Sequence, residues 1–176
     1  MKCLPIRSKT QSGFTAIELL IVIVVGLVIA AVAGGRIAGL FGKSDEATES
    51  GNYQSLIAAA KSLRTNQGYG TTGTNLVPSM IAIKAIPSLM TVSAGKLYNT
   101  WNGEVTLVST GIGYTVSTAG LPSDMCIKIA KGMSGSGSIV KTTINGGAAI
   151  NGQVDVATAT TQCSTETNLL TWTVSS

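Results

Sequence analysis

The chain has 176 residues, a length that suits one modest domain together with a long terminal helix. Its net charge is +4, and three basic residues before Gly13 supply most of it. Because the excess of positive charge lies in this short segment, it is no argument for nucleic-acid binding. Without histidine, neither a Ser-His-Asp nor a Cys-His catalytic set can be built, and three cysteines alone argue against a zinc site. We therefore expect a protein that is not an enzyme and uses no cofactor or metal.

Residues 1–13 form a short polar leader that contains Lys2, Arg7 and Lys9 and no acid. We expect no folded structure in this leader. Basic residues that precede an apolar segment favour retention on the cytoplasmic side of a membrane.

The segment from Phe14 to Gly35 is the most distinctive part of the chain. It has no charged residue from Leu19 onward, and Glu18 stands immediately before that apolar run. As a helix it rises about 33 Å, enough to cross a hydrocarbon core of about 30 Å. A carboxylate at membrane depth is costly and normally marks a specific function.

Three interpretations of this segment compete. It could be a secretory signal peptide, with Ala31-Val32-Ala33 as the cleavage site, although an acid inside the apolar run and the length of that run disfavour this. It could also be a permanent single-pass anchor. The third interpretation rests on a resemblance between its first residues and a known processing motif.

The run Gly13-Phe14-Thr15-Ala16-Ile17-Glu18 before an apolar helix resembles the prepilin motif of type IV pilins and type II secretion pseudopilins. The resemblance implies that a prepilin peptidase cuts between Gly13 and Phe14 and methylates the new N-terminus. Glu18 becomes the fifth mature residue, with a role in filament assembly. Residues 14–35 are then the transmembrane segment and later the filament core.

We expect the helix to continue over residues 36–65 as an amphipathic segment, so that one long helix covers 14–65. Its apolar residues recur at helical spacing and form a stripe able to pack on a globular domain. The stripe comprises Tyr53, Leu56, Ile57, Ala60 and Leu63, and the opposite face carries Glu49, Gln54, Lys61 and Arg64.

The remaining residues, 66–176, are predicted to form a globular head with an antiparallel sheet, which makes the fold class α+β. A short helix or turn is expected within 78–90, and a helix over 121–131, capped by Ser123 or Asp124 and ended by Gly132. The predicted strands are 104–109, 114–118, 139–144, 153–157 and 169–174.

Several features of the head resemble type IVb-like major pilins, including conjugative thin-pilus subunits. They are Trp101-Asn-Gly before a hairpin, Leu121-Pro-x-x-x-Cys at a helix start, a second cysteine and a closing Asn168-Leu-Leu-Thr-Trp. Cys3 leaves with the leader, and the remaining pair, Cys126 and Cys163, is expected to form a disulfide in an oxidising compartment. The resemblance implies that this pair bounds a variable, exposed D-region. The short leader and Phe14 as first mature residue instead match the type IVa branch.

These resemblances imply a structural subunit that forms a helical homopolymer. The expected partners are a prepilin peptidase, an inner-membrane assembly platform and its ATPase. The precursor would lie in the bacterial inner membrane and the mature protein in an extracellular pilus. Such a pilus would serve adhesion, aggregation or conjugative contact, and the sequence does not identify its receptor. The alternatives are a secretion pseudopilin or minor pilin, and an adhesive module with a simple membrane anchor.

Overall fold

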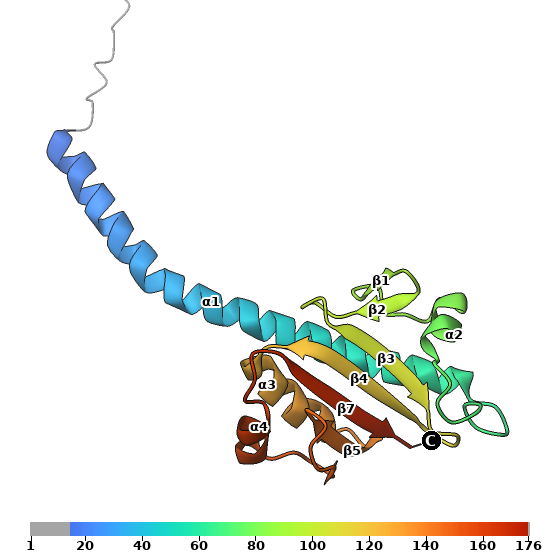
Figure 1. The fold of residues 1–176 in the computed structure, drawn as a ribbon. Coiled ribbons are helices and arrows are strands. Elements are labelled where there is room, and N and C mark those ends of the chain that lie inside the picture. Colours follow the sequence, from blue (N-terminus) through green and yellow to red (C-terminus); the bar gives the residue numbers. More distant parts are fainter. Residues whose placement is uncertain (1–14, 176) are drawn as a thin grey trace, which may run out of the picture. The chain divides into compact units, whose positions relative to one another are not determined.

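The computed structural model describes the backbone of residues 15–175 and the side chains of residues 15–29 and 45–175. It divides into two compact units, residues 1–42 and residues 43–176, and we call the second the globular unit. The helix α1 (Ala16–Ala60) contributes to both (Figure 1). A 3₁₀ turn, η1 (Lys61–Leu63), follows it, so the regular α-helix ends five residues before the predicted boundary.

The apolar start of α1 agrees with the prediction of a helix in this region. Within the residues whose side chains are described, no helix is both long enough and apolar enough to cross a membrane. The predicted span of 14–35 includes Phe14 and the side chains of 30–35, which lie outside those residues. The membrane-spanning assignment therefore stays a prediction.

The globular unit contains a seven-stranded antiparallel sheet with the order β1-β2-β3-β4-β7-β5-β6. The strands are β1 (Thr91–Ser93), β2 (Lys96–Tyr98), β3 (Glu104–Ser109), β4 (Tyr114–Leu121), β5 (Ile139–Ile144), β6 (Ile150–Asn151) and β7 (Asn168–Val174). Both edge strands are very short. β3, β4, β5 and β7 confirm four of the five predicted strands.

One face of the sheet forms the core, because buried and half-exposed residues alternate along the central strands. Val116 of β4 lies opposite Trp172 of β7, and both are fully buried. The outward face is rich in hydroxyl side chains, as the pair Ser117 and Thr171 illustrates with a 2.9 Å hydrogen bond. This is the pattern of a sheet with one covered face.

The helices α1 and α3 (Ser123–Ser134) supply the apolar side chains that cover this face, with the short helix α2 (Val77–Ala82) beside β2 and β3. The predicted stripe on α1 is confirmed: Tyr53, Leu56 and Ala60 have no exposed surface. The opposite face is not as predicted at one position. Glu49 is fully buried, because it points toward the loop between β2 and β3.

The C-terminal part differs from the sequence prediction at three places. The predicted cap by Ser123 or Asp124 is wrong, because α3 begins at Ser123 itself with Pro122 at its N-cap, and the Ser123 hydroxyl donates to the Cys163 carbonyl instead. The helix α3 does not end at Gly132 but continues to Ser134. Glycine lowers helix stability by about 1 kcal/mol relative to alanine, which is too little to end a helix that packs on the sheet. The predicted strand 153–157 is wrong. Asp155 instead caps the helix α4 (Val156–Gln162), accepting a hydrogen bond from the Thr158 amide at 2.9 Å.

A disulfide joins Cys126 on α3 to Cys163 at the end of α4, which confirms the predicted pairing. Both cysteines are fully buried. The hydroxyl of Ser123 also donates to the Cys163 carbonyl, so a hydrogen bond and the disulfide fix the end of α4 against α3. β5, β6 and α4 all lie between the two cysteines in sequence.

Loss of this disulfide is expected to lower the free energy of unfolding by about 4 kcal/mol, because it closes a loop of 37 residues in the unfolded chain. Urea unfolding of the full chain with Cys126→Ala and Cys163→Ala measures the effect, and Cys3→Ala serves as the control. Free reaction of both thiols with an alkylating agent, without prior reduction, would contradict the pairing.

Candidate assembly site and the contacts that hold the helix

Glu18 lies in the first turn of α1 and is exposed in the single chain. Its Oε2 accepts hydrogen bonds from the Thr15 amide at 3.2 Å and the Thr15 hydroxyl at 3.0 Å. The Glu18 amide in turn donates to the Thr15 hydroxyl at 3.4 Å. This reciprocal arrangement is a capping box, in which a Thr and a Glu three residues later satisfy free helix amides.

Three of the predicted site residues lie in this region, and the structure describes only one of them. Gly13 and Phe14 lie outside the described residues. Glu18 is described, and the Thr15 hydroxyl and amide occupy one oxygen of its carboxylate. Its role in assembly stays a prediction. The sequence had not indicated the cap, although Thr-x-x-Glu before an apolar run is a recognisable signature of it.

A second acid, Glu49, attaches α1 to the sheet. Its Oε1 accepts a hydrogen bond from the Thr100 amide at 2.7 Å and another from the Thr100 hydroxyl. Oε2 is buried and has no hydrogen-bond partner among the described residues. Since Glu49 is four residues before Tyr53, the apolar stripe extended back by one turn predicts its inward position.

Thr100 belongs to a tight loop that Asn99 organises. The Asn99 Oδ1 accepts from the amides of Trp101 and Gly103, at 3.0 and 2.8 Å. Its Nδ2 donates to the hydroxyl of Thr118 on β4, at 2.9 Å. A Cβ on Gly103 would lie 1.7 Å from a backbone oxygen of β4, which explains glycine in the Trp101-Asn-Gly motif.

Tyr53 completes the connection between α1 and the sheet. Its hydroxyl shares a 2.9 Å hydrogen bond with the Thr118 hydroxyl, and its ring lies 5.2 Å from that of Trp172. Burial raises the pKa of Tyr53 above its ordinary value, and the nearby Glu49 carboxylate adds to the rise. The tyrosine therefore stays neutral and can act as a hydrogen-bond donor in the core.

These contacts are structural and do not form a catalytic or metal-binding arrangement. Glu49, Tyr53, Asn99 and Thr118 lie together, but their hydrogen bonds are made within the fold. Within the described residues, no group of three or more histidine, cysteine or acidic side chains could hold a metal ion. The arrangement fixes the helix on the sheet.

Glu49→Ala is expected to lower the free energy of unfolding by about 1–3 kcal/mol, because the part-buried Thr100 amide loses its acceptor. Glu49→Gln keeps an acceptor oxygen and is expected to cost less. Urea unfolding of the full chain followed by tryptophan fluorescence measures both, with the exposed Glu166→Ala as control. Equal stability of Glu49→Ala and the control would contradict this account.

Comparison with solved structures identifies similar folds. A crystal structure of a type IVb pilin from Salmonella typhi is 27% identical, with a TM-score of 0.63, covering 74% of this chain and 99% of that chain. An NMR structure of the Salmonella typhi type IVb pilin PilS is 26% identical, with a TM-score of 0.53, covering 77% and 99% respectively. The comparison with curated proteins finds no match.

The family model described as PilS N terminal matches residues 43–175, which is most of the chain and nearly the whole globular unit. The similar crystal structure agrees with the fold described above, a helix packed on an antiparallel sheet. Pilins are structural proteins, so the family is not one of enzymes. The chain belongs to the PilS family of type IVb pilins.

Proposed function

We propose that the chain is cleaved after Gly13 and polymerises through its N-terminal helix into a filament on the cell surface. The observation that carries this proposal is the exposure of the apolar start of α1. Its large apolar side chains are at least half exposed in the single chain: Ile17, Leu19, Leu20, Ile21, Val22, Ile23, Val24, Val25, Leu27, Val28 and Ile29. Such a surface requires lipid or other apolar helices around it.

Glu18 supplies a reason for subunits to adopt one register. Cleavage creates an amine at Phe14, four residues before Glu18 in the sequence. An unpaired charge in an apolar helix bundle costs several kcal/mol. In this proposal the amine of one subunit pairs with the Glu18 carboxylate of its neighbour, which fixes one stagger. A pair within one subunit is the alternative, and it would neutralise both charges without specifying a neighbour.

The capping box provides a rival role for the same residue. Two hydrogen bonds from Thr15 already reach the Glu18 carboxylate within one subunit. A glutamine at this position can cap the helix nearly as well as glutamate does, whereas pairing with an amine requires the negative charge of glutamate. Glutamine therefore separates the two roles, and valine removes both.

Contacts that repeat head to tail without closing produce an open filament, which fits one helix as the polymerising element. The precursor then waits in the bacterial inner membrane, and an assembly platform with its ATPase adds it to the extracellular pilus. Adhesion, aggregation and contact with recipient cells are the roles that suit such a fibre. The match to the PilS family favours a pilin over a secretion pseudopilin.

The mature protein is expected to begin at Phe14, with a methylated amine, and to lack Cys3. Mass spectrometry of the N-terminal peptide measures this start. Gly13→Val is expected to block cleavage, because the peptidase must accommodate a side chain where glycine has none. A mature start at Gly34 would support a signal peptide instead, and an intact Met1 would support a permanent anchor.

Glu18→Gln is expected to leave cleavage intact and to reduce filament yield strongly, because it keeps the cap and removes the charge. Glu18→Val is expected to have a similar or larger effect. Electron microscopy and immunoblots of sheared filaments measure the yield, with Thr15→Ala as a control that weakens only the cap. Abundant filaments from Glu18→Gln would show that capping, not charge pairing, is its role.

A further inference from the structure

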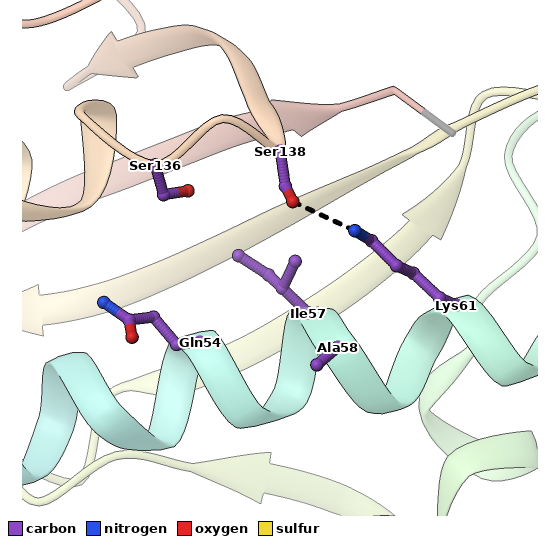
Figure 2. A pocket seen from close by; sticks show the side chains of 6 residues that line it. All are labelled: Gln54, Ile57, Ala58, Lys61, Ser136 and Ser138. Carbon is purple, nitrogen blue, oxygen red and sulfur yellow. Dashed lines mark hydrogen bonds between the residues drawn. The ribbon is translucent and has the colours of Figure 1, made fainter.

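A shallow pocket of about 260 Å³ lies between α1 and the loop that joins α3 to β5. Gln54, Ile57, Ala58 and Lys61 line it from the helix side, and Ser136 and Ser138 from the loop (Figure 2). All six residues belong to the globular unit. The Lys61 Nζ donates to the Ser138 Oγ at 3.0 Å, which places the ammonium group at the pocket.

The chemistry of the lining favours an anion. One ammonium group, two hydroxyls and one amide supply hydrogen-bond donors, and no acid contributes to the lining. Among the described residues, Lys61 has no carboxylate within ion-pair distance, whereas Lys96 and Lys128 each have one. Ile57 and Ala58 add an apolar surface that can contact the methylene groups of an acidic side chain.

The complementary charge lies on the same helix. Asp45, Glu46 and Glu49 occupy its beginning in the globular unit, and Lys61 and Arg64 follow its end. Glu49 is buried against Thr100, but the side chains of Asp45 and Glu46 are half exposed. Glu46 has the longer side chain, which can reach across the apolar part of the pocket to the ammonium group.

We propose that the pocket receives the Glu46 carboxylate of a second copy of this chain. The carboxylate accepts hydrogen bonds from Lys61 and from the serine hydroxyls, and its methylene groups contact Ile57. Because donor and acceptor surfaces differ, the contact is heterologous and repeats from copy to copy. The inference rests on the proposed polymerisation and adds a contact between globular units to it.

The positions of the two groups along the helix set a spacing. Glu46 and Lys61 are fifteen residues apart in sequence, which corresponds to about 23 Å of helix. Two parallel copies in this contact are therefore displaced by about 23 Å along the helix direction. Phe14 and Glu18 are only four residues apart, so this contact joins a copy to a different neighbour from the one that Glu18 pairs with. It is a second determinant of register.

A charge reversal tests the contact in the full chain, expressed in cells that assemble it. Lys61→Glu is expected to reduce the yield of sheared filaments roughly tenfold or more, because it places two acids opposite each other at every repeat. Adding Glu46→Lys to the same chain restores the opposite charges and is expected to recover most of the yield. A fold defect alone would not be rescued by the second change.

The matched control is Lys131→Glu, which changes an exposed lysine on α3 that does not line the pocket. Its filament yield is expected to equal that of the unmodified chain. Immunoblots and protease resistance of the membrane-bound subunits confirm that each variant accumulates in a folded form. Loss of filaments in the control as well would overturn the assignment of the effect to the pocket.

Crosslinking between cysteines tests the contact directly. Chains with only Glu46→Cys are co-expressed with chains with only Lys61→Cys, and their filaments are treated with a short bifunctional maleimide, which can span the distance that the two long side chains bridged. Dimers are expected from the mixture and not from either variant alone. Normal filaments from Lys61→Glu, with no trapped dimers, would overturn this inference and leave the proposed polymerisation standing.

Absence of filaments from the unmodified chain would instead contradict the proposed polymerisation itself. A third result would show which of two possible ligands binds in the pocket. If Lys61→Glu filaments form normally but lose attachment to recipient cells, the pocket binds a ligand outside the filament, and the contact with Glu46 is wrong.

Discussion

The packing of α1 on the inner face of the sheet is the interaction on which the rest of the globular unit depends. Tyr53 contacts Trp172, and the Tyr114 hydroxyl donates to the carbonyl of Ile57 at 2.6 Å. The fully buried Tyr114 of β4 and Trp172 of β7 both contact this helix, and they would be more exposed to water without it. Because the hydroxyls of both tyrosines form hydrogen bonds, the contact has a fixed orientation as well as apolar area.

This attachment explains why one helix can carry two kinds of surface. The stripe at Tyr53, Leu56 and Ala60 is used by the sheet, so it is not available to other copies. The exposed side retains Gln54, Ala58 and Lys61 beside the pocket. In the part before residue 30, the apolar side chains are exposed all round, as expected of a helix that other helices or lipid surround.

Sequence patterns predicted the central strands because their alternation is strong and their turns contain glycine. Residues 104–109 are one example, and residues 114–118 are another, although that strand continues beyond the prediction to Leu121. The strands β1 and β2 have only three residues each, too few for an alternating pattern to be recognised. The segment around Asp155 was misassigned because its alternation over a few residues also fits a helix start, and the deciding contact is the cap to Thr158.

The functional residues were predictable to different degrees. Glu18 was found because it is the single acid beside an apolar run, and the cysteines because they form an even pair. The burial of Glu49 was missed because the stripe was not extended back by one turn from Tyr53. Its partner Thr100, 51 residues away in sequence, could not be predicted. The pocket at Lys61 could not be predicted either. It requires Ser138, 77 residues later, to come within 3.0 Å of the lysine.

The short strands at both ends of the sheet have a consequence for a protein that accumulates in many copies. β1 offers three residues to a neighbouring strand and β6 only two. A longer exposed edge would template pairing with the next copy and lead to amyloid-like aggregation at high local concentration. With such short edge strands, closely packed copies gain few backbone hydrogen bonds by joining their sheets. They associate instead through side-chain surfaces, whose contacts can be specific.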